Sequence, residues 1–228
     1  MNTDVGWKPM AGVILMGLAG GLGACRAENP APDPLAARRI SLTAPRIDGT
    51  MSLEAAISAR RSVRRFSPDA LTLEQIGQLL WSAQGLTDPR GWRAAPSAGA
   101  TYPLELYVLL ADGVYRYHPR EHRIEQVAEG DRRSAVWQAG LRQDALRTAP
   151  AVFVFAATPE RTERRYGSRA TRYIHMEVGH AAQNLSLQAV ALGLGSVMIG
   201  AMEDDRVHAA AGLPAGQEVL YLVPVGYP

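Results

Sequence analysis

Apolar residues follow two different spacings along the chain, and each spacing predicts one type of secondary structure. Apolar positions three and four residues apart predict helices, most clearly over 73–84 and 173–192. Unbroken apolar runs of strand length predict buried strands, most clearly over 149–157. The complete pattern predicts helices near 53–57, 73–84, 131–146, 173–192 and 203–211, and strands over 104–111, 113–118, 149–157, 196–199 and 219–225.

Local signals support several boundaries of these elements. Ser52 is typical of a helix N-cap, and Thr72 with Gln75 fits the capping-box pattern. The dipeptide Asp112-Gly113 predicts a tight turn between two paired strands. Helices and strands are mixed without strict alternation. This order favours the α+β fold class over a doubly wound parallel sheet.

The N-terminal segment has the pattern of a targeting signal. An apolar, glycine-rich stretch over 10–22 is too short to span a bilayer comfortably as a helix. Small residues then lead directly to Cys25, and this Leu-Gly-Ala-Cys sequence resembles a bacterial lipobox. We therefore expect a lipoprotein-type signal peptide over 1–24, lipidation of Cys25, a Pro/Ala-rich tether over 25–45 and one domain over 46–228.

This interpretation implies an exported, membrane-anchored lipoprotein that faces the periplasm or the cell exterior. A plain secretory signal, or a weak membrane anchor with an incidental cysteine, would explain the same stretch. A cytoplasmic location follows if the signal interpretation fails.

Composition and charge exclude several classes of protein. The chain has 228 residues, of which 47% are apolar and 20% charged, so it has enough apolar side chains for a large core. A net charge of +2 with scattered arginines does not favour a nucleic-acid partner. A single cysteine excludes a disulfide framework. His175 and His180 are about 140° apart on a helix, so they do not share one metal ion, and we expect no metal site.

Three short segments carry candidate chemistry, and each has a simpler interpretation. Arg60, Arg61, Ser62 and Arg64 form a group that can bind a phosphate, or they are a solvated helix end. The small residues over 96–100 let backbone amides approach a flat ligand, or they form an ordinary surface loop. The small residues over 193–200 offer a similar surface, or they form a helix cap before a strand.

The order of these segments resembles the nitroreductase superfamily of flavin enzymes, and specifically its SagB-type dehydrogenase branch. The resemblance runs from about residue 51 to residue 228 and rests on the segments ARRSVRRF, LLWSAQG, PSAGATYPLELY, RYGSRATRYIHMEVGHAAQNL, GLGSVMIGAM and LPVGYP. It implies an α+β fold with a mixed, mostly antiparallel sheet flanked by helices, bound FMN, and a homodimer with the flavin between its subunits.

The resemblance also implies a role for individual residues. It assigns contacts with the FMN phosphate and ribityl chain to Arg60, Arg61, Ser62 and Arg64. It assigns a loop that reaches the flavin across the dimer to Pro96, Ser97 and Ala98, a backbone segment near flavin N5 to Ile199, Gly200 and Ala201, and a flavin hydrogen bond to Gln84.

The resemblance implies an oxidoreductase that passes hydride or electrons through FMN to or from a small organic or peptide substrate. One reaction is NAD(P)H-dependent reduction of a nitro compound or quinone, and the other is oxidation of a peptide azoline. Azoline oxidases of the family carry a Lys-Tyr pair where this chain has Arg165-Tyr166. Tyr166 is therefore the candidate catalytic residue, or else a half-buried aromatic, whereas a guanidinium stays protonated and is a poor base.

A second class of function stays open at this point. The protein is then a lipid-anchored binding module whose degenerate flavin pocket performs no redox turnover. The expected export also affects the electron donor, because nicotinamide cofactors are scarce outside the cytoplasm. An exported enzyme would instead take electrons from its organic substrate or from a membrane carrier.

Overall fold

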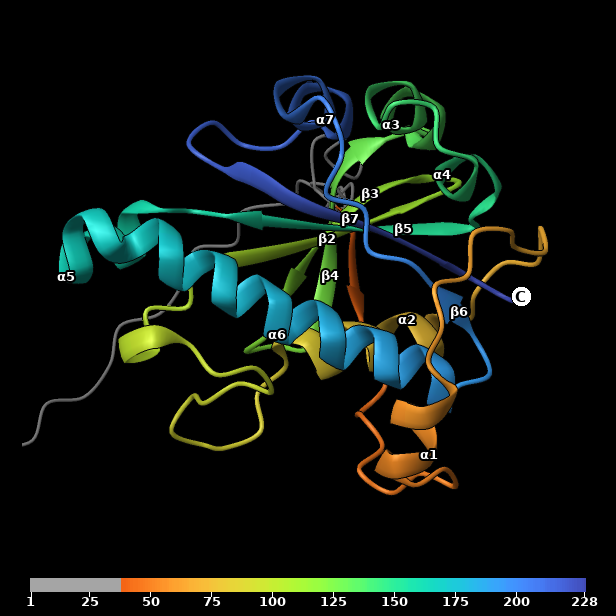
Figure 1. Ribbon diagram of the computed structural model, residues 1–228, viewed down its shortest axis with the longest axis horizontal. Helices are drawn as coiled ribbons and strands as arrows, with labels where there is room; N and C mark the ends of the chain where they lie inside the picture. The colour runs from red at the N-terminus through yellow and green to blue at the C-terminus, as the bar shows by residue number, and fades with distance from the viewer. Residues whose placement is uncertain (1–37) are drawn as a thin grey trace, which may run out of the picture. The chain divides into compact units, whose positions relative to one another are not determined.

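A seven-stranded antiparallel sheet forms the centre of the protein, with strand order β1-β4-β3-β2-β5-β7-β6 (Figure 1). The computed structural model describes residues 38–228. The expected signal peptide, Cys25 and the tether up to residue 37 lie outside the described residues. The strands are β1 (Arg39–Ser41), β2 (Leu104–Leu110), β3 (Gly113–His118), β4 (Arg123–Glu129), β5 (Ala151–Ala157), β6 (Gly195–Ser196) and β7 (Glu218–Gly226).

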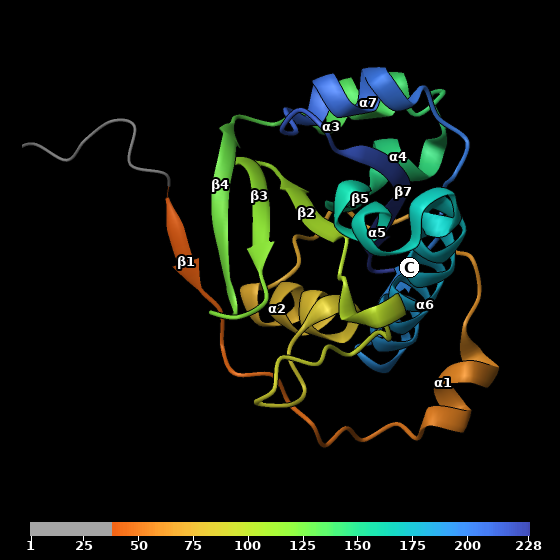
Figure 2. The ribbon, with the colours of Figure 1, turned by 90° about the vertical axis from the view of Figure 1, so that its left-hand side faces the viewer.

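Helices cover both faces of this sheet, as Figures 1 and 2 show. The helices are α1 (Leu53–Ala59), α2 (Leu73–Gln84), α3 (Arg133–Ala139), α4 (Asp144–Thr148), α5 (Glu160–Tyr166), α6 (Ala170–Ala191) and α7 (Asp204–Ala211), with short 3₁₀ turns η1 (Ala98–Ala100) and η2 (Gly167–Arg169). Helices α2 and α6 pack on one face, and α3, α4 and α7 pack on the other.

Strand β5 shows why the fold has two cores. All of its side chains are buried, and successive side chains of a strand point to opposite faces of the sheet. Phe153 and Phe155 join the core under α2 and α6, whereas Val152 and Val154 join the core under α3, α4 and α7. The sequence-based prediction of an α+β fold with a mostly antiparallel sheet is confirmed.

The predicted helix caps are present. The Ser52 hydroxyl accepts a hydrogen bond from the Ala55 N–H at 3.1 Å, so Ser52 is the N-cap of α1. Thr72 and Gln75 form both bonds of the capping box of α2. These caps satisfy backbone N–H groups that a helix start otherwise leaves without partners.

The predicted helix over 131–146 is wrong as a single element. The chain forms α3 and α4 instead, because Leu141 and Arg142 between them have positive φ angles of 59° and 54°. The close approach of Gly140 to Leu146 accompanies this break, since a Cβ at residue 140 would collide with the Leu146 side chain. The predicted strand over 196–199 is also shorter than expected. β6 covers only Gly195–Ser196, and Ile199 forms an isolated bridge with Leu222.

Three elements were not predicted from the sequence: β1, β4 and α5. β1 lies inside the segment expected to be a tether. It pairs with β4, and Leu42 next to it is buried, so the folded part of the chain begins before residue 46. None of the helices described within 38–228 is long and apolar enough to cross a membrane.

Replacing Ile124 tests whether β4 belongs to the core. Ile124 is fully buried opposite Ile40, so we expect Ile124→Ala to lower the free energy of unfolding by about 2–4 kcal/mol. The matched control is Val127→Ala in the same strand, where the side chain is 39% exposed and the loss stays below about 1 kcal/mol. Denaturant titration followed by circular dichroism measures both. Equal, small losses would contradict the buried placement of β4.

Candidate functional site

The predicted arginine segment lies directly after α1 and contacts β6. The Val63 N–H donates to the Ser196 carbonyl at 3.0 Å, and Ser62 pairs with Ser196 in a parallel bridge. The contact is close, because a Cβ built on Gly195 would lie 2.7 Å from the Val63 Cβ. The structure therefore brings the segment 60–64 next to the segment that starts at Gly195.

The arginines of this segment differ in their partners. Arg61 Nη1 donates to the carbonyls of Ser58 and Arg60 at 2.9 and 2.8 Å, so this guanidinium stabilises the end of α1. Arg60 and Arg64 form no ion pair with any described residue, and Arg64 and Ser62 are exposed. Two uncompensated guanidiniums and a hydroxyl are thus free to bind an anion.

The segment 199–201 lies a few residues after β6, the strand that the arginine segment contacts, and it contains free backbone donors. Ile199 does not offer them itself, because its N–H and carbonyl both bond to Leu222 at 2.8 and 3.0 Å and its side chain is buried. Gly200 and Ala201 are exposed, and their N–H groups have no partner among the described residues. Of the three residues expected to contact the flavin through their backbone, Gly200 and Ala201 therefore have free N–H groups. The hydrogen bonds of Ile199 attach this segment to β7.

The loop that contains Pro96, Ser97 and Ala98 is held in an uncommon backbone conformation. Gly99, Ala100 and Tyr102 have φ angles of 57°, 54° and 46°. Side chains of the loop and of α5 support this shape. Ser97 Oγ accepts from the Tyr102 N–H at 2.9 Å, and Arg165 Nη1 donates to the Gly99 carbonyl at 3.1 Å.

Tyr166 lies beside the same loop. A Cβ built on Gly99 would lie 2.6 Å from the Tyr166 hydroxyl, and the Tyr166 ring packs edge-on against Tyr173 with 4.9 Å between centroids. The structure therefore brings the Arg165-Tyr166 pair next to the predicted flavin loop, although the two segments are far apart in sequence. The catalytic role of Tyr166 stays a prediction.

Within one chain, the loop and the arginine segment lie at opposite ends of α6 (Figure 1). The loop contacts α5, which precedes α6, whereas Ser196 of β6 bonds to Ser186 near the end of α6. Helix α6 has 22 residues, which corresponds to about 33 Å at the usual helical rise. In a single copy, the loop over 96–98 therefore lies apart from the arginine segment.

Gln84 belongs to a buried polar cluster rather than to this exposed surface. Its side chain is 1% exposed, and its Oε1 accepts from Arg93 Nη1 at 2.8 Å. Its Nε2 has no hydrogen-bond partner. In this geometry the Gln84 carboxamide oxygen faces Arg93, and the expected flavin hydrogen bond of Gln84 stays a prediction.

Glu177 of α6 is a further buried polar group that the sequence analysis missed. Its side chain is 2% exposed, and its Oε1 has no partner. Burial raises the pKa of Glu177 to about 7, while the neighbouring Ser97 side chain and the Arg93 guanidinium act in the opposite direction. A signal was available, because Glu177 follows Ile174 by three positions and precedes Ala181 by four, so it falls on the apolar face of its helix.

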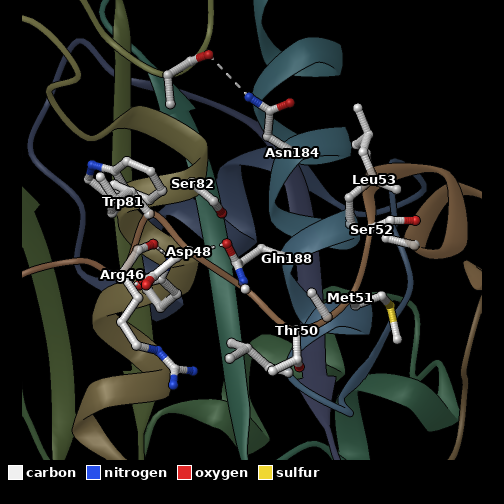
Figure 3. Close-up of a pocket in the computed structure, with 18 residues that line it drawn as sticks. Arg46, Asp48, Thr50, Met51, Ser52, Leu53, Trp81, Ser82, Asn184 and Gln188 are labelled. Atoms are coloured by element: carbon white, nitrogen blue, oxygen red, sulfur yellow. Dashed lines mark hydrogen bonds between the residues drawn. The ribbon is translucent and has the colours of Figure 1, made fainter.

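A groove of about 510 Å³ lies between the segment 46–53, α2 and α6 (Figure 3). Its wall includes Trp81 of α2 and Gln188 of α6, and Asn184 beside it donates to the Ala94 carbonyl at 3.3 Å. None of the predicted flavin-binding residues lines this groove. Among residues 38–228, no group of three or more His, Cys, Asp or Glu side chains is placed to hold a metal ion.

Comparisons with known proteins agree with this fold. The model of the nitroreductase family matches residues 57–227, so the chain belongs to this family of oxidoreductases. A protein of Methanocaldococcus jannaschii whose name assigns it to the nitroreductases is 43% identical over 182 residues, which cover 77% of this chain and 91% of that protein. A crystal structure described as a nitroreductase from Ralstonia eutropha superposes with a TM-score of 0.76 at 29% identity, covering 85% of this chain and 90% of the other.

A second curated relative is the trifolitoxin-processing protein TfxB of Rhizobium leguminosarum bv. trifolii. It is 32% identical over 146 residues, which cover 56% of this chain. The match spans only 39% of that longer relative.

The pKa of Glu177 predicts an unusual pH dependence of stability. A buried carboxyl with a raised pKa binds its proton more tightly in the folded state than in the unfolded state. Its contribution is therefore most favourable at acidic pH and is lost as the pH rises from about 4.5 to about 7. We expect Glu177→Gln to match the wild type near pH 4.5 and to exceed its free energy of unfolding by about 3 kcal/mol above pH 7.

Denaturant titrations over a range of pH measure this difference. The matched control is Glu163→Gln, which makes the same change at an exposed position of α5 and leaves the pH profile parallel to that of the wild type. A Glu177→Gln profile parallel to the wild type would show that Glu177 is charged in the folded protein at neutral pH.

Proposed function

We propose that this nitroreductase-family protein is an FMN-dependent oxidoreductase of the SagB-type dehydrogenase branch and that it works as a homodimer. The observation that carries the proposal is that free guanidiniums and free backbone amides occur on two segments that both adjoin β6, one by contact with Ser196 and the other by following it in the chain. Arg60 and Arg64 have no carboxylate partner, and the N–H groups of Gly200 and Ala201 on the neighbouring segment have no acceptor among the described residues.

These residues fit the two chemical parts of FMN. Arg60 and Arg64 would bind the phosphate through charge-assisted hydrogen bonds, with the Ser62 hydroxyl as a further donor. The Gly200 and Ala201 amides would donate to polar atoms of the ring, and Arg61 and Ile199 would hold these segments in place. The cofactor supplies hydride and electron transfer, and the protein supplies binding, orientation and electrostatic stabilisation.

Exposed apolar and small residues on α1 and α6 support the homodimer. Leu53 and Ile57 of α1 are 61% and 55% exposed, and Met176 of α6 is 52% exposed. Gly179 lies in the middle of α6, and a Cβ built on it would meet nothing within 4 Å. A bare glycine costs helix stability, so its use here favours close approach of another backbone.

A twofold axis across α6 would also complete the site. In such a dimer the same surface of each copy is buried, and the two α6 helices run in opposite directions across the axis. The Pro96–Ala98 loop at one end of α6 would then face Arg60, Arg64 and Gly200 of the second copy. Each flavin would thus receive residues from both chains.

The substrate is proposed to be a small organic molecule or a peptide. Tyr166 is the residue beside the loop that can donate or accept a proton there. Arg165 bonds to the Gly99 carbonyl, so we assign it to holding the loop rather than to moving a proton. The similarity to the trifolitoxin-processing protein supports a peptide as the substrate.

The cellular location forms part of the same proposal. Lipidation of Cys25 would anchor the enzyme outside the cytoplasm, where its electrons would come from its organic substrate or a membrane carrier.

Anaerobic mixing of the flavin-loaded protein with NADPH tests the choice of donor. Slow or absent flavin bleaching is expected, and rapid bleaching would contradict it.

Substituting Arg60 or Arg64 tests the phosphate contacts. We expect Arg60→Ala and Arg64→Ala each to weaken FMN binding by about 1.5–3 kcal/mol, because each removes a charge-assisted bond. The matched control is Arg147→Ala, which removes an exposed guanidinium of α4 and leaves FMN affinity unchanged. Fluorescence titration with FMN measures all three. Unchanged affinity in both test variants would refute the contacts, and wild-type protein that is colourless and refuses FMN would favour the binding-module alternative.

A bulky residue at position 179 tests the dimer. We expect Gly179→Arg to give a monomer that retains little FMN, because the added side chain would keep the two α6 helices apart. The control is Ala209→Arg, which adds the same side chain at an exposed position of α7 on the other face of the sheet. Light scattering coupled to size-exclusion chromatography measures the mass, and absorbance gives the flavin content. A dimeric, flavin-loaded Gly179→Arg protein would rule out this interface.

A further inference from the structure

A second cavity, of about 270 Å³, lies where the end of α2, strands β2 and β3 and helix α5 meet. Its charged lining consists of Arg93, Arg116, Arg120, Arg161, Glu105 and Glu121, with Gln84 and His118 beside them. Gln84 is the one member that the resemblance to flavin enzymes had singled out. The cavity shares no residue with the segments 60–64 and 199–201, so it is separate from the proposed phosphate contacts.

The positive charge of this cavity exceeds the negative charge. Glu105 is almost fully buried, and both of its oxygens are occupied, Oε2 by Arg116 at 2.9 Å and Oε1 by Arg161. Arg93 and Arg120 form no ion pair with any residue of the described part of the chain. Glu121 at the exposed rim is the one other carboxylate of the lining, so an excess of guanidinium charge remains.

An unpaired donor also faces this polar environment. Gln84 is 1% exposed, and its Oε1 is fixed by the hydrogen bond from Arg93, which leaves Nε2 as the group without a partner. A buried amide N–H without an acceptor is unfavourable, because it has lost its hydrogen bonds to water. Burial also lowers the pKa of Arg93, although the nearby Glu105 and Glu177 carboxylates act in the opposite direction. Gln84 Nε2 therefore lacks an acceptor, and Arg93 has no direct ion pair with any described residue.

We propose that this cavity binds a small molecule through a carboxylate or phosphate group. The planar guanidiniums of Arg93 and Arg120 match an oxyanion that accepts several hydrogen bonds, and the Gln84 amide adds a neutral donor. The volume admits a small acid rather than a large ligand. The site is separate from the proposed phosphate contacts, because none of its residues lies in the segments 60–64 or 199–201.

Titration of the full-length, FMN-saturated protein with inorganic phosphate and with succinate at constant ionic strength tests the proposal. Isothermal calorimetry measures the binding. We expect saturable binding of at least one probe, and the tighter one indicates whether the natural ligand carries a phosphate or a carboxylate. No saturable binding of either probe up to tens of millimolar would overturn the proposal.

Variants then place the bound anion in the protein. Arg120→Ala removes an exposed guanidinium of the cavity, and Gln84→Glu puts a negative charge in place of the unpaired donor while keeping an acceptor for Arg93. Each should weaken binding by about tenfold or more. Arg206→Ala, which removes an exposed arginine of α7, is the matched control and should not change it. Binding that survives in both cavity variants but is lost in Arg64→Ala would place the anion at the other arginine cluster and overturn the assignment.

Discussion

Helix α6 sets the distance between the arginine segment and the loop over 96–98. Its buried residues pack against the sheet and against α2 along its whole length, so neither end can shift independently. The arginine segment and β6 lie at the C-terminal end of α6, and the loop over 96–98 lies near its start. A rigid helix of this length keeps these segments apart in one copy. In the proposed homodimer, the loop of a second copy would bring the missing segment to the arginines.

The loop is suited to this role because its shape is held from within its own chain. Residues in the left-handed region cost free energy unless the surroundings compensate, and three such residues occur within the short stretch from Gly99 to Tyr102. Arg161 donates to the Tyr102 carbonyl at 3.0 Å, and Thr162 bonds to Thr101. Helix α5 therefore acts as a support that presents the loop in one conformation, which lowers the entropic cost of binding.

The sequence predicted the parts of the fold whose cause is local. The capping box at Thr72 and the apolar run of β5 depend on nearby residues, and both are present as expected. β4 was missed because it is mostly polar and contains one fully buried apolar residue, Ile124. The break at Leu141 depends on a positive φ angle at an ordinary residue, which no local pattern indicates.

The same distinction holds for the site. Arg60 and Arg64 were chosen for their chemistry, and nothing in the described structure neutralises them. The sequence alone could not show that the backbone groups of Ile199 bond to β7, or that Gln84 accepts a hydrogen bond from Arg93. Both interactions depend on where the chain folds back on itself. Glu177 was missed although its position on the apolar face of α6 gave a local signal of burial.

The proposed sharing of one flavin site between two chains can be tested by mixing two defective proteins. One carries Arg60→Ala and Arg64→Ala, and the other carries Gly99→Trp, which would collide with Tyr166 and displace the loop. Alone, neither should retain FMN. After the subunits are exchanged, heterodimers contain one site with both arginines and an intact loop, so flavin binding should reappear in the mixture. If the mixture forms heterodimers and stays colourless, the two halves of the site do not come from different chains.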